Sequence, residues 1–490
     1  MKHIFRYILF GILLTGIVSC KKDWLDVTAT NQIKAKDQFK QTSGYKDALM
    51  GVYIGMTKPS SYARDMTWNL VDILSQQYAI FPNLALYTDV QSYKYRSTRA
   101  MPQIDALWKG QYNTIANVNG ILDEMEKNTD VLGKIDKAII KGELLGLRAF
   151  LHFDLIRLYG ESNYANRPEL VNKLTIPYVI TLSKDLTPQF SYKETFALLQ
   201  KDISDALELL KEDPSYKEIS RPAEYYMEVN REGFYDKREQ RMNYYAVKAL
   251  QARVNIWQGS TQDLQNAASA AEEVIAKSGA KLRIATSQVG NDKILSSEQL
   301  FSLNVTAFAN IVGQFFNGEN NTNYDALILL RPTAETLFET SNQNIGVPDI
   351  RFNTLLTLHS RGMVSQKLLQ ATGNQYRNIM PLMKLPEMYY IAAEAYLNTN
   401  LPKSIQYLNK VRESRGILQE IPADATLEVV KAELQKEYRK EFIAEGQLFF
   451  YYKRKGLTSF PGLSTQITAN DQIYRLPYPD NEIEFGNRVQ

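Results

Sequence analysis

Apolar residues recur along much of the chain at intervals of three and four, which is the spacing of helices with one buried face. The segment 136–160 is apolar around most of its circumference, as a buried helix would be, and ends at Gly160 in the C′ position. The segments 106–127 and 192–212 each have a single apolar face. In the first, that face carries Leu107, Tyr112, Ile115, Val118 and Leu122. These patterns predict a mainly α-helical protein.

Two later pairs of segments resemble each other. In 243–259 with 263–279, and again in 386–400 with 401–416, a helix rich in aromatic residues and alanine precedes a second helix that ends near glycine or a turn. Small side chains let helix backbones approach closely, as in stacked tetratricopeptide hairpins. The helices 136–160 and 192–212 would form a third hairpin around a long insertion. We therefore predict a tetratricopeptide-like scaffold, with a plain helical bundle as the alternative. The alanines concerned are Ala246, Ala249, Ala252, Ala392, Ala393 and Ala395.

Between the helices lie long stretches without periodicity, and loops of such length are usually functional. Minor strand content is expected at 281–284 and 300–305. No low-complexity linker divides residues 20–490, so one unit is predicted. The irregular stretches are 81–105, 161–188, 214–242 and 281–386.

The first 19 residues have the features of a secretory signal. Lys2 and Arg6 precede an apolar run, 7–18, that is shorter than the roughly 20 residues needed to span a bilayer. Ser19 and Cys20 then resemble a bacterial lipobox, which implies that Cys20, the only cysteine, is lipidated and becomes the mature N-terminus. Its acyl chains would anchor the protein without a transmembrane helix. The alternative is an ordinary signal peptide followed by an unpaired thiol.

Charge and composition narrow the possible partners. The formal net charge of +3 falls to +1 when Lys2 and Arg6 are removed, so neither a nucleic acid nor a polybasic membrane contact is predicted. The chain has 30 tyrosines against 4 tryptophans and 20 phenylalanines. Tyrosine offers a flat apolar ring with a polar tip, which suits recognition surfaces as well as cores.

Catalytic and cofactor motifs are missing from the sequence. The mature chain has two histidines, and we interpret His152, inside the most buried helix, as a hydrogen-bonded core residue. No zinc-protease, thiol-pair, nucleophile-elbow or phosphate-loop motif occurs. We predict no cofactor. A structural calcium ion bound in a loop is kept as an alternative, although no sequence motif marks a site for it.

Carboxylates are the remaining catalytic candidates. A glycosidase needs two of them about 5–10 Å apart, and such a pair leaves no local sequence signature. A dispersed glycosidase site therefore stays as the less favoured alternative to a protein that is not an enzyme. Around Phe442, the charged residues Glu437, Arg439, Glu441 and Glu445 could instead form an internal salt-bridge network.

Several stretches, in order, resemble the SusD/RagB family of outer-membrane nutrient-binding lipoproteins of Bacteroidetes. "DWLDV" follows Cys20, Trp108 begins the family's W-x3-Y-x2-I helix and should lie in the core, and "GELLGLRAFLHFDLIRLYG" matches the most specific block. "SSEQLFSLNV", "VPDIRF" and "YRKEFIAEGQLFFYYKRKG" resemble later blocks. One departure is "EGQLFF", where many members have arginine after the glycine.

The resemblance implies a fold and a role. The fold would be a tetratricopeptide-like scaffold with long ligand loops, preceded by a signal peptide at 1–19 and divided into an N-terminal part (20–215) and a C-terminal part (216–490). The protein would be lipid-anchored and surface-exposed on the cell outer membrane. It would bind oligosaccharides, or alternatively peptides, and pass them to a TonB-dependent, SusC-like transporter.

Two aromatic stretches could hold such a ligand. Sugars present apolar C–H faces edged by hydroxyls, so a binding site needs flat rings beside amide or guanidinium groups. Both stretches fall where the resemblance places variable ligand loops, and we favour the second. In the alternative interpretation these rings close the loops onto the scaffold. The candidates are Tyr78, Phe81, Asn83, Tyr87, Tyr93 and Arg96 in the first stretch, and Phe315, Phe316, Asn317, Asn320 and Tyr324 in the second.

Overall fold

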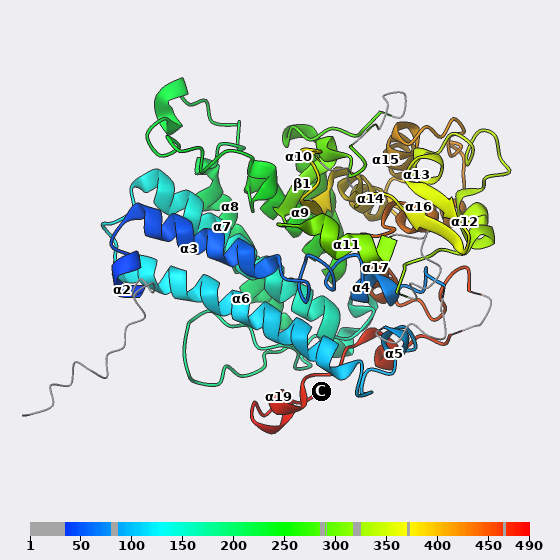
Figure 1. Cartoon of the computed structure of the whole chain (residues 1–490). Helices are drawn as coiled ribbons and strands as arrows, with labels where there is room; N and C mark the ends of the chain where they lie inside the picture. Colours follow the sequence, from blue (N-terminus) through cyan, green and yellow to red (C-terminus); the bar gives the residue numbers. More distant parts are fainter. Residues whose placement is uncertain are drawn as a thin grey trace, which may run out of the picture.

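Three long helices form one side of the molecule in the computed structural model (Figure 1): α3 (Thr42–Met56), α6 (Met101–Lys127) and α7 (Lys134–Tyr159). Helix α6 packs against both α3 and α7. Within the described part of the chain, no helix is long and apolar enough to cross a membrane. The structure describes residues 35–79, 87–284, 290, 292–316, 325–369, 373–463 and 467–490.

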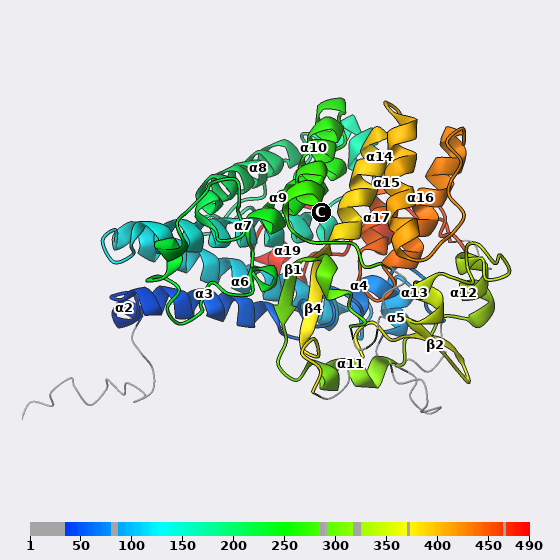
Figure 2. The same cartoon turned by 90° about the horizontal axis from the view of Figure 1, so that it is seen from above.

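The other long helices stand in a row (Figure 2). Helix α7 pairs with α8, α9 with α10, and α14 with α15, while α10 packs against α14 and so joins two of these hairpins. The predicted helical hairpins and the mainly helical fold are confirmed. The row consists of α8 (Tyr192–Leu209), α9 (Tyr244–Gln258), α10 (Thr261–Lys277), α14 (Leu385–Tyr396), α15 (Leu401–Ser414) and α16 (Leu427–Glu441), with α17 (Leu448–Lys455) behind it.

Local chemistry defines the ends of these helices. Ser191 and Ser260 cap α8 and α10 through reciprocal bonds with Glu194 and Asp263. Gly160 ends α7 as predicted, although its backbone is extended (φ −83°, ψ 173°) rather than left-handed. A Cβ there would lie 2.6 Å from the Tyr192 hydroxyl, so the close approach of two segments, and not φ, requires this glycine.

Short strands and helices fill the stretch predicted as irregular. Strand β1 (Gln299–Asn304) pairs antiparallel with β4 (Ile379–Lys384), and β2 (Leu356–His359) pairs with β3 (Gly362–Ser365). The expected strand at 300–305 is confirmed, whereas 281–284 is not a strand. The prediction that 281–386 is irregular was wrong, because β4 is buried on both faces and shows no polar alternation. The stretch also contains α11 (Phe308–Phe316), α12 (Arg331–Phe338) and α13 (Ile350–Asn353).

Very short helices connect the remaining segments. They are α2 (Ala35–Gln38), α4 (Leu70–Ile73), α5 (Thr88–Gln91), α18 (Asp471–Tyr474) and α19 (Asp480–Glu484). Two of them, α4 and α5, lie toward the same end of the molecule as α12 (Figure 1). Between α5 and α6 the chain runs without regular structure, as the sequence predicted, but the helix that follows begins at Met101 rather than near 106.

The core contains the residues predicted for it. Trp108 is buried between helices and its ring lies 4.9 Å from that of Tyr159. His152 is fully buried: its Nε2 accepts a hydrogen bond from the Val179 N–H and its Nδ1 lies 2.9 Å from the Arg148 carbonyl. Burial lowers the pKa of His152 to about 3, so the ring is neutral and structural.

A buried charge network joins the C-terminal elements. Of the four residues that the sequence suggested for it, Glu437, Glu441 and Glu445 take part, whereas Arg439 forms no ion pair with the described residues. Arg415, with no exposed surface, bonds Glu298 at 2.7 Å and Glu441 at 2.8 Å. Burial raises the pKa of Glu437, but the neighbouring Arg351 outweighs it and lowers that pKa to about 2. We call this set the charge network: Glu298, Asp349, Arg351, Lys367, Lys384, Arg412, Arg415, Glu437, Glu441 and Glu445.

Candidate functional site

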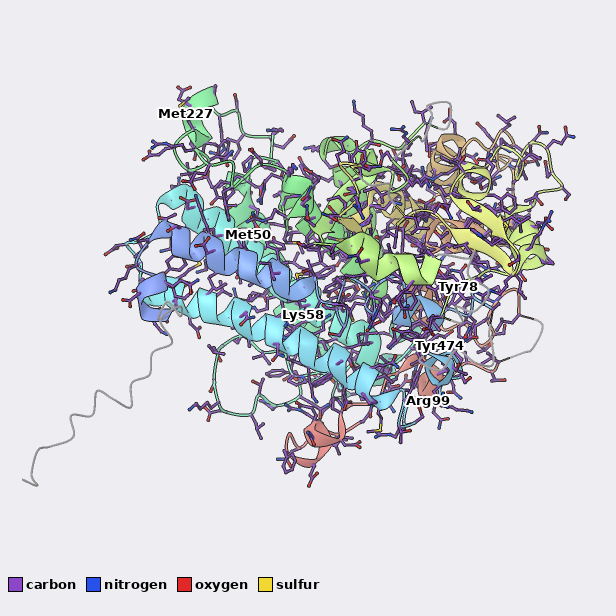
Figure 3. All side chains as sticks on the ribbon, in the orientation of Figure 1. Met50, Lys58, Tyr78, Arg99, Met227 and Tyr474 are labelled. Atoms are coloured by element: carbon purple, nitrogen blue, oxygen red, sulfur yellow. The ribbon has the colours of Figure 1, made fainter. Side chains whose placement is uncertain are left out.

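Three adjoining pockets lie at the end of the molecule where α4, α5 and α12 meet the C-terminal segments. The largest, which we call the central cleft, has a volume of about 750 Å³. Figure 3 places Tyr78 and Tyr474 at this end, away from Met227. The central cleft is lined by the segments 76–79, 91–93 and 462–463 and by Leu330, Thr333, Ile467 and Ile473.

Two carboxamides hold the first wall of the central cleft together. The Gln76 side chain donates to the Gln91 carbonyl at 2.7 Å, and the Gln91 side chain donates to the Tyr78 carbonyl at 2.9 Å. Gln76 (φ 62°) and Tyr93 (φ 57°) both adopt the left-handed backbone conformation that non-glycine residues seldom use. Such strain concentrates at functional sites, and here two strained residues line one cavity.

The two predicted tyrosines in this wall differ in exposure. Tyr78 is 5% exposed and donates to Asp72 Oδ2 at 2.5 Å, so little more than one edge of its ring reaches the cleft. Tyr93 is half-buried, its hydroxyl donates to the Leu74 carbonyl at 2.9 Å, and its ring lies parallel to that of Phe460. Tyr93 is therefore the tyrosine of this wall that is most open to a ligand.

An unused amide lines this wall of the cleft, and a fully buried carboxylate, Asp72, lies behind Tyr78. Burial raises the pKa of Asp72 to about 7, against the opposing hydrogen bonds from Tyr78 and the Ala444 N–H. The Nε2 of Gln77 is buried and has no hydrogen-bond partner among the described residues. A buried amide N–H without an acceptor costs free energy, which a ligand oxygen or a water would recover.

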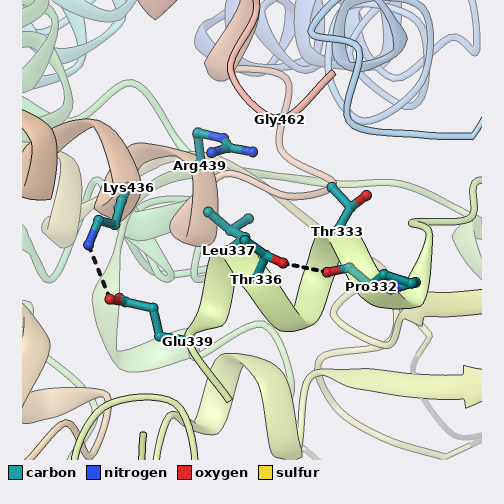
Figure 4. Close-up of a pocket in the computed structure, with 8 residues that line it drawn as sticks. All are labelled: Pro332, Thr333, Thr336, Leu337, Glu339, Lys436, Arg439 and Gly462. Atoms are coloured by element: carbon teal, nitrogen blue, oxygen red, sulfur yellow. Dashed lines mark hydrogen bonds and ion pairs between the residues drawn. The ribbon is translucent and has the colours of Figure 1, made fainter. Parts of the chain in front are cut away.

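Smaller pockets extend the cleft on both sides. One of about 440 Å³ shares Thr333 and Gly462 with the central cleft and lies between α12 and α16 (Figure 4). The other, of about 470 Å³, shares Tyr93 and contains the predicted Arg96. Arg96 pairs with Asp480 at 2.7 Å, and both side chains are more than half exposed. The three pockets thus follow one another along a single surface.

The second predicted stretch is placed differently. Phe315 and Phe316 are each 1% exposed and pack against Trp68 with ring centroids 5.3 and 5.2 Å away. Tyr87, from the first stretch, is 2% exposed and packs on Phe315. These three rings close loops onto the scaffold, which is the alternative given above, and they offer no open surface for stacking. The predicted residues Cys20, Phe81, Asn83, Asn317, Asn320 and Tyr324 lie outside the described residues.

Several lining residues were missed from the sequence. Gln91 stands in the predicted stretch, and Gln76 and Gln77 lie directly before it, so a search for carboxamides beside aromatic residues would have found them. No local signal marks Leu330, Thr333, Gly462, Leu463, Ile467 or Ile473, because these residues reach the cleft only through the tertiary fold. In the described portion of the chain, no group of three or more histidine, cysteine or carboxylate side chains could hold a metal ion.

Two protein-family models match the sequence in chain order. A model described as starch-binding and associating with the outer membrane matches residues 23–225, and a model of the SusD family matches residues 316–473. Together they span more than half of the chain. No curated protein matches it.

Solved structures share the whole fold. A SusD superfamily protein from Bacteroides thetaiotaomicron is 22% identical, with a TM-score of 0.72 over 92% of this chain and 99% of its own. A SusD-like carbohydrate-binding protein from Bacteroides vulgatus is 18% identical, with a TM-score of 0.68 over 91% and 96%.

A third relative was solved with a ligand. Surface glycan-binding protein A from Bacteroides thetaiotaomicron, in complex with laminarihexaose, is 15% identical, with a TM-score of 0.65 over 91% of this chain and 99% of its own. At these identities the structural similarity establishes only the fold. Membership of the family rests on the two family models. The chain therefore belongs to the SusD/RagB family, whose glycan-binding proteins are not enzymes, in agreement with the prediction from sequence.

Proposed function

We propose that this protein is a surface lipoprotein that binds an oligosaccharide in the central cleft and delivers it to a TonB-dependent, SusC-like transporter. The observation that carries the proposal is the cleft itself: about 750 Å³, with a tyrosine ring and carboxamides on one wall and aliphatic side chains opposite. Its volume is within the range of small-molecule sites, which are mostly apolar with a few placed polar groups.

The chemistry of the lining favours a sugar. The partly exposed ring of Tyr93 can contact the C–H face of a pyranose, while Gln77 can donate to a hydroxyl. Leu330, Leu463 and Ile467 supply an apolar surface for the other face. A peptide ligand would depend less on stacking against an aromatic ring and more on groups that form hydrogen bonds with its backbone. The laminarihexaose complex of the 15% identical glycan-binding protein supports the same class of ligand.

Attachment to the outer membrane would follow from lipidation of Cys20, after removal of residues 1–19. The family model associated with the outer membrane supports that location. Residues 20–215 and 216–490 would then act as the N-terminal and C-terminal parts of one binding unit. Transfer to the transporter would take place at the surface that carries the three pockets.

Tyr93→Ala is expected to weaken binding of the oligosaccharide about tenfold or more, because it removes the ring against which the sugar would lie. Tyr93→Phe keeps the ring and loses only the hydroxyl bond to the Leu74 carbonyl, so it should bind nearly as well as the native protein. Calorimetric titration of the mature chain against matched panels of oligosaccharides and peptides measures both.

A control for this test is Tyr225→Ala, which removes a partly exposed tyrosine that lines none of the three pockets. Its affinity should equal that of the native protein. Unchanged affinity in a folded Tyr93→Ala variant would remove the central cleft as the sugar site. If only peptides bind saturably, the proposed oligosaccharide ligand is wrong, whereas the proposed role in nutrient uptake is kept.

Cys20→Ser is expected to release the protein from the membrane fraction, because the thioether-linked lipid can no longer form. Fractionation of cells and mass spectrometry of the N-terminal peptide measure this. A variant that stays with the membrane, or a native N-terminus without lipid, would contradict the anchor. Ser19→Ala keeps a small residue before the cysteine and should remain anchored.

A further inference from the structure

The pocket between α12 and α16 contains an arginine that has no counter-ion among the residues that the structure describes. Arg439 lines this pocket beside Gly462, at the junction with the central cleft (Figure 4). It forms no ion pair with any carboxylate of the described residues, and its buried Nε has no hydrogen-bond acceptor there. We call this site the Arg439 pocket.

This lack of a partner is unusual in its surroundings. Arg412 and Arg415, close to the same helix, are each held by two glutamates. On α16 itself, Lys436 and Lys440 share Glu339 on the opposite wall, with N–O distances of 3.2 and 3.5 Å. Glu339 is therefore already engaged, and Arg439 adds a positive charge that no neighbouring carboxylate balances.

The guanidinium of Arg439 is held in place by its neighbours. A Cβ on Gly462 would lie 2.6 Å from Nη2, and the backbone of Gly462 has a φ of +83°, so glycine at this position leaves room for the guanidinium. Arg439 also interacts electrostatically with Tyr452 at this edge of the cavity. The side chain is therefore positioned at the edge of the cavity before any ligand arrives.

A partly buried guanidinium without an anion has a clear chemical preference. Its planar N–H groups match a carboxylate or a sulfate ester, and charge-assisted bonds of this kind are about twice as strong as neutral ones. Thr333 and Thr336 add hydroxyls on the facing wall. The Arg439 pocket also has a volume of about 440 Å³, which is larger than one anionic group requires.

We infer that the Arg439 pocket binds the anionic substituent of an acidic oligosaccharide, such as the carboxylate of a uronic acid, whose neutral part lies in the central cleft. This inference rests on the proposed function, since it assigns the class of sugar to the same continuous surface. Arg439 would then determine specificity, while Tyr93 would serve neutral and acidic sugars alike.

The test compares each acidic sugar with its own neutral form. Oligogalacturonates, oligomannuronates and glucuronate-bearing xylo-oligosaccharides are titrated calorimetrically into the mature chain, each beside its methyl ester, together with a sulfated oligosaccharide and neutral glucans. We expect one acidic oligosaccharide to bind about tenfold or more tightly than its ester. Arg439→Gln should abolish that preference and leave the affinity for the ester unchanged. High salt should weaken binding of the acid only in the native protein.

Two further variants separate charge at Arg439 from charge in general. Arg439→Lys keeps the charge without the planar fork and should retain only part of the preference. Lys431→Gln removes a cation from the exposed face of α16, where Lys431 pairs with Glu428, and should leave all affinities unchanged. If the native protein prefers the sulfated sugar and Arg439→Gln loses this preference, the result supports an anion-binding subsite and identifies the anion as sulfate.

The remaining outcomes distinguish the two proposals. If neutral glucans bind and no acidic sugar is preferred, or if Arg439→Gln keeps the preference, this inference is overturned and the proposed function stands. If no oligosaccharide of any class binds, the proposed function fails and the inference fails with it.

Discussion

Arg415→Met is expected to lower the free energy of unfolding by about 3–5 kcal/mol. The native guanidinium has no exposed surface and bonds Glu298 and Glu441, which are themselves buried. The substitution fills a similar space but leaves two carboxylates short of their counter-ion, and an uncompensated buried charge is costly. Urea unfolding followed by circular dichroism measures the loss as a shift of the midpoint.

The loss should depend on pH in a defined direction. Burial raises the pKa of Glu441, but Arg415 and Lys384 outweigh it and lower that pKa well below the usual 4.5. A lowered pKa means that the ion pair contributes fully above pH 4.5 and loses its contribution as the pH falls toward the lower native value. The difference between native and variant proteins should therefore be largest at neutral pH and shrink below pH 4.5.

The control is Lys201→Met, which breaks the exposed pair with Asp205 on α8 and should leave the midpoint unchanged. Equal midpoints for Arg415→Met and the native protein would contradict the role of the charge network in stability. A deficit that stays constant from pH 7 to well below pH 4.5 would contradict its electrostatic origin.

Gly446→Ala is expected to destabilise the protein by about 3 kcal/mol, the sum of two effects. Gly446 has a φ of +71°, where a residue with a Cβ is disfavoured by roughly 1–2 kcal/mol. The new Cβ would also lie 2.2 Å from the Thr67 carbonyl oxygen, and overpacking against a fixed backbone costs roughly 1–3 kcal/mol. The unfolding midpoint measures the sum.

Gly51 provides a matched control, because it lies exposed within α3 and a Cβ there would meet nothing within 4 Å. Gly51→Ala should raise stability by roughly 0.5–1 kcal/mol, since alanine loses less conformational freedom in a helix. A Gly446→Ala variant as stable as the native protein would show that the segment after α16 can move away from Thr67.

The scaffold could be predicted from the sequence because its helices bury one face. Alanine-rich helices such as α9 and α14 also indicated hairpins that pack closely. The stretch 281–386 could not be predicted in the same way. Strand β4 has no exposed side, and the paired residues of β1 and β4 are at least 75 positions apart in sequence (379 − 304), so neither local pattern nor spacing reveals their pairing.

The candidate site was predictable in part. Tyr78, Tyr93 and Arg96 line the pockets. They could be predicted because a mixture of aromatic and polar residues in a loop is a local sequence signal. Phe315 and Phe316 carry the same signal but are buried, because an aromatic ring that closes a loop looks the same in sequence as one that meets a ligand. Arg439 could not be singled out from the sequence, because it belongs to a helix with many charged residues. Only the fold shows that the glutamates near it are paired with other arginines.

The charge network also has a consequence for the order of folding. Lys384 pairs with Glu441 and Glu445, Arg415 pairs with Glu441, and Glu298 pairs with Arg415, which lies more than a hundred positions later in the sequence. During synthesis from the N-terminus, the C-terminal half therefore cannot reach its native packing until the chain is nearly complete. Contacts of such long range slow folding, so the charged side chains of the network stay unpaired in the growing chain for longer.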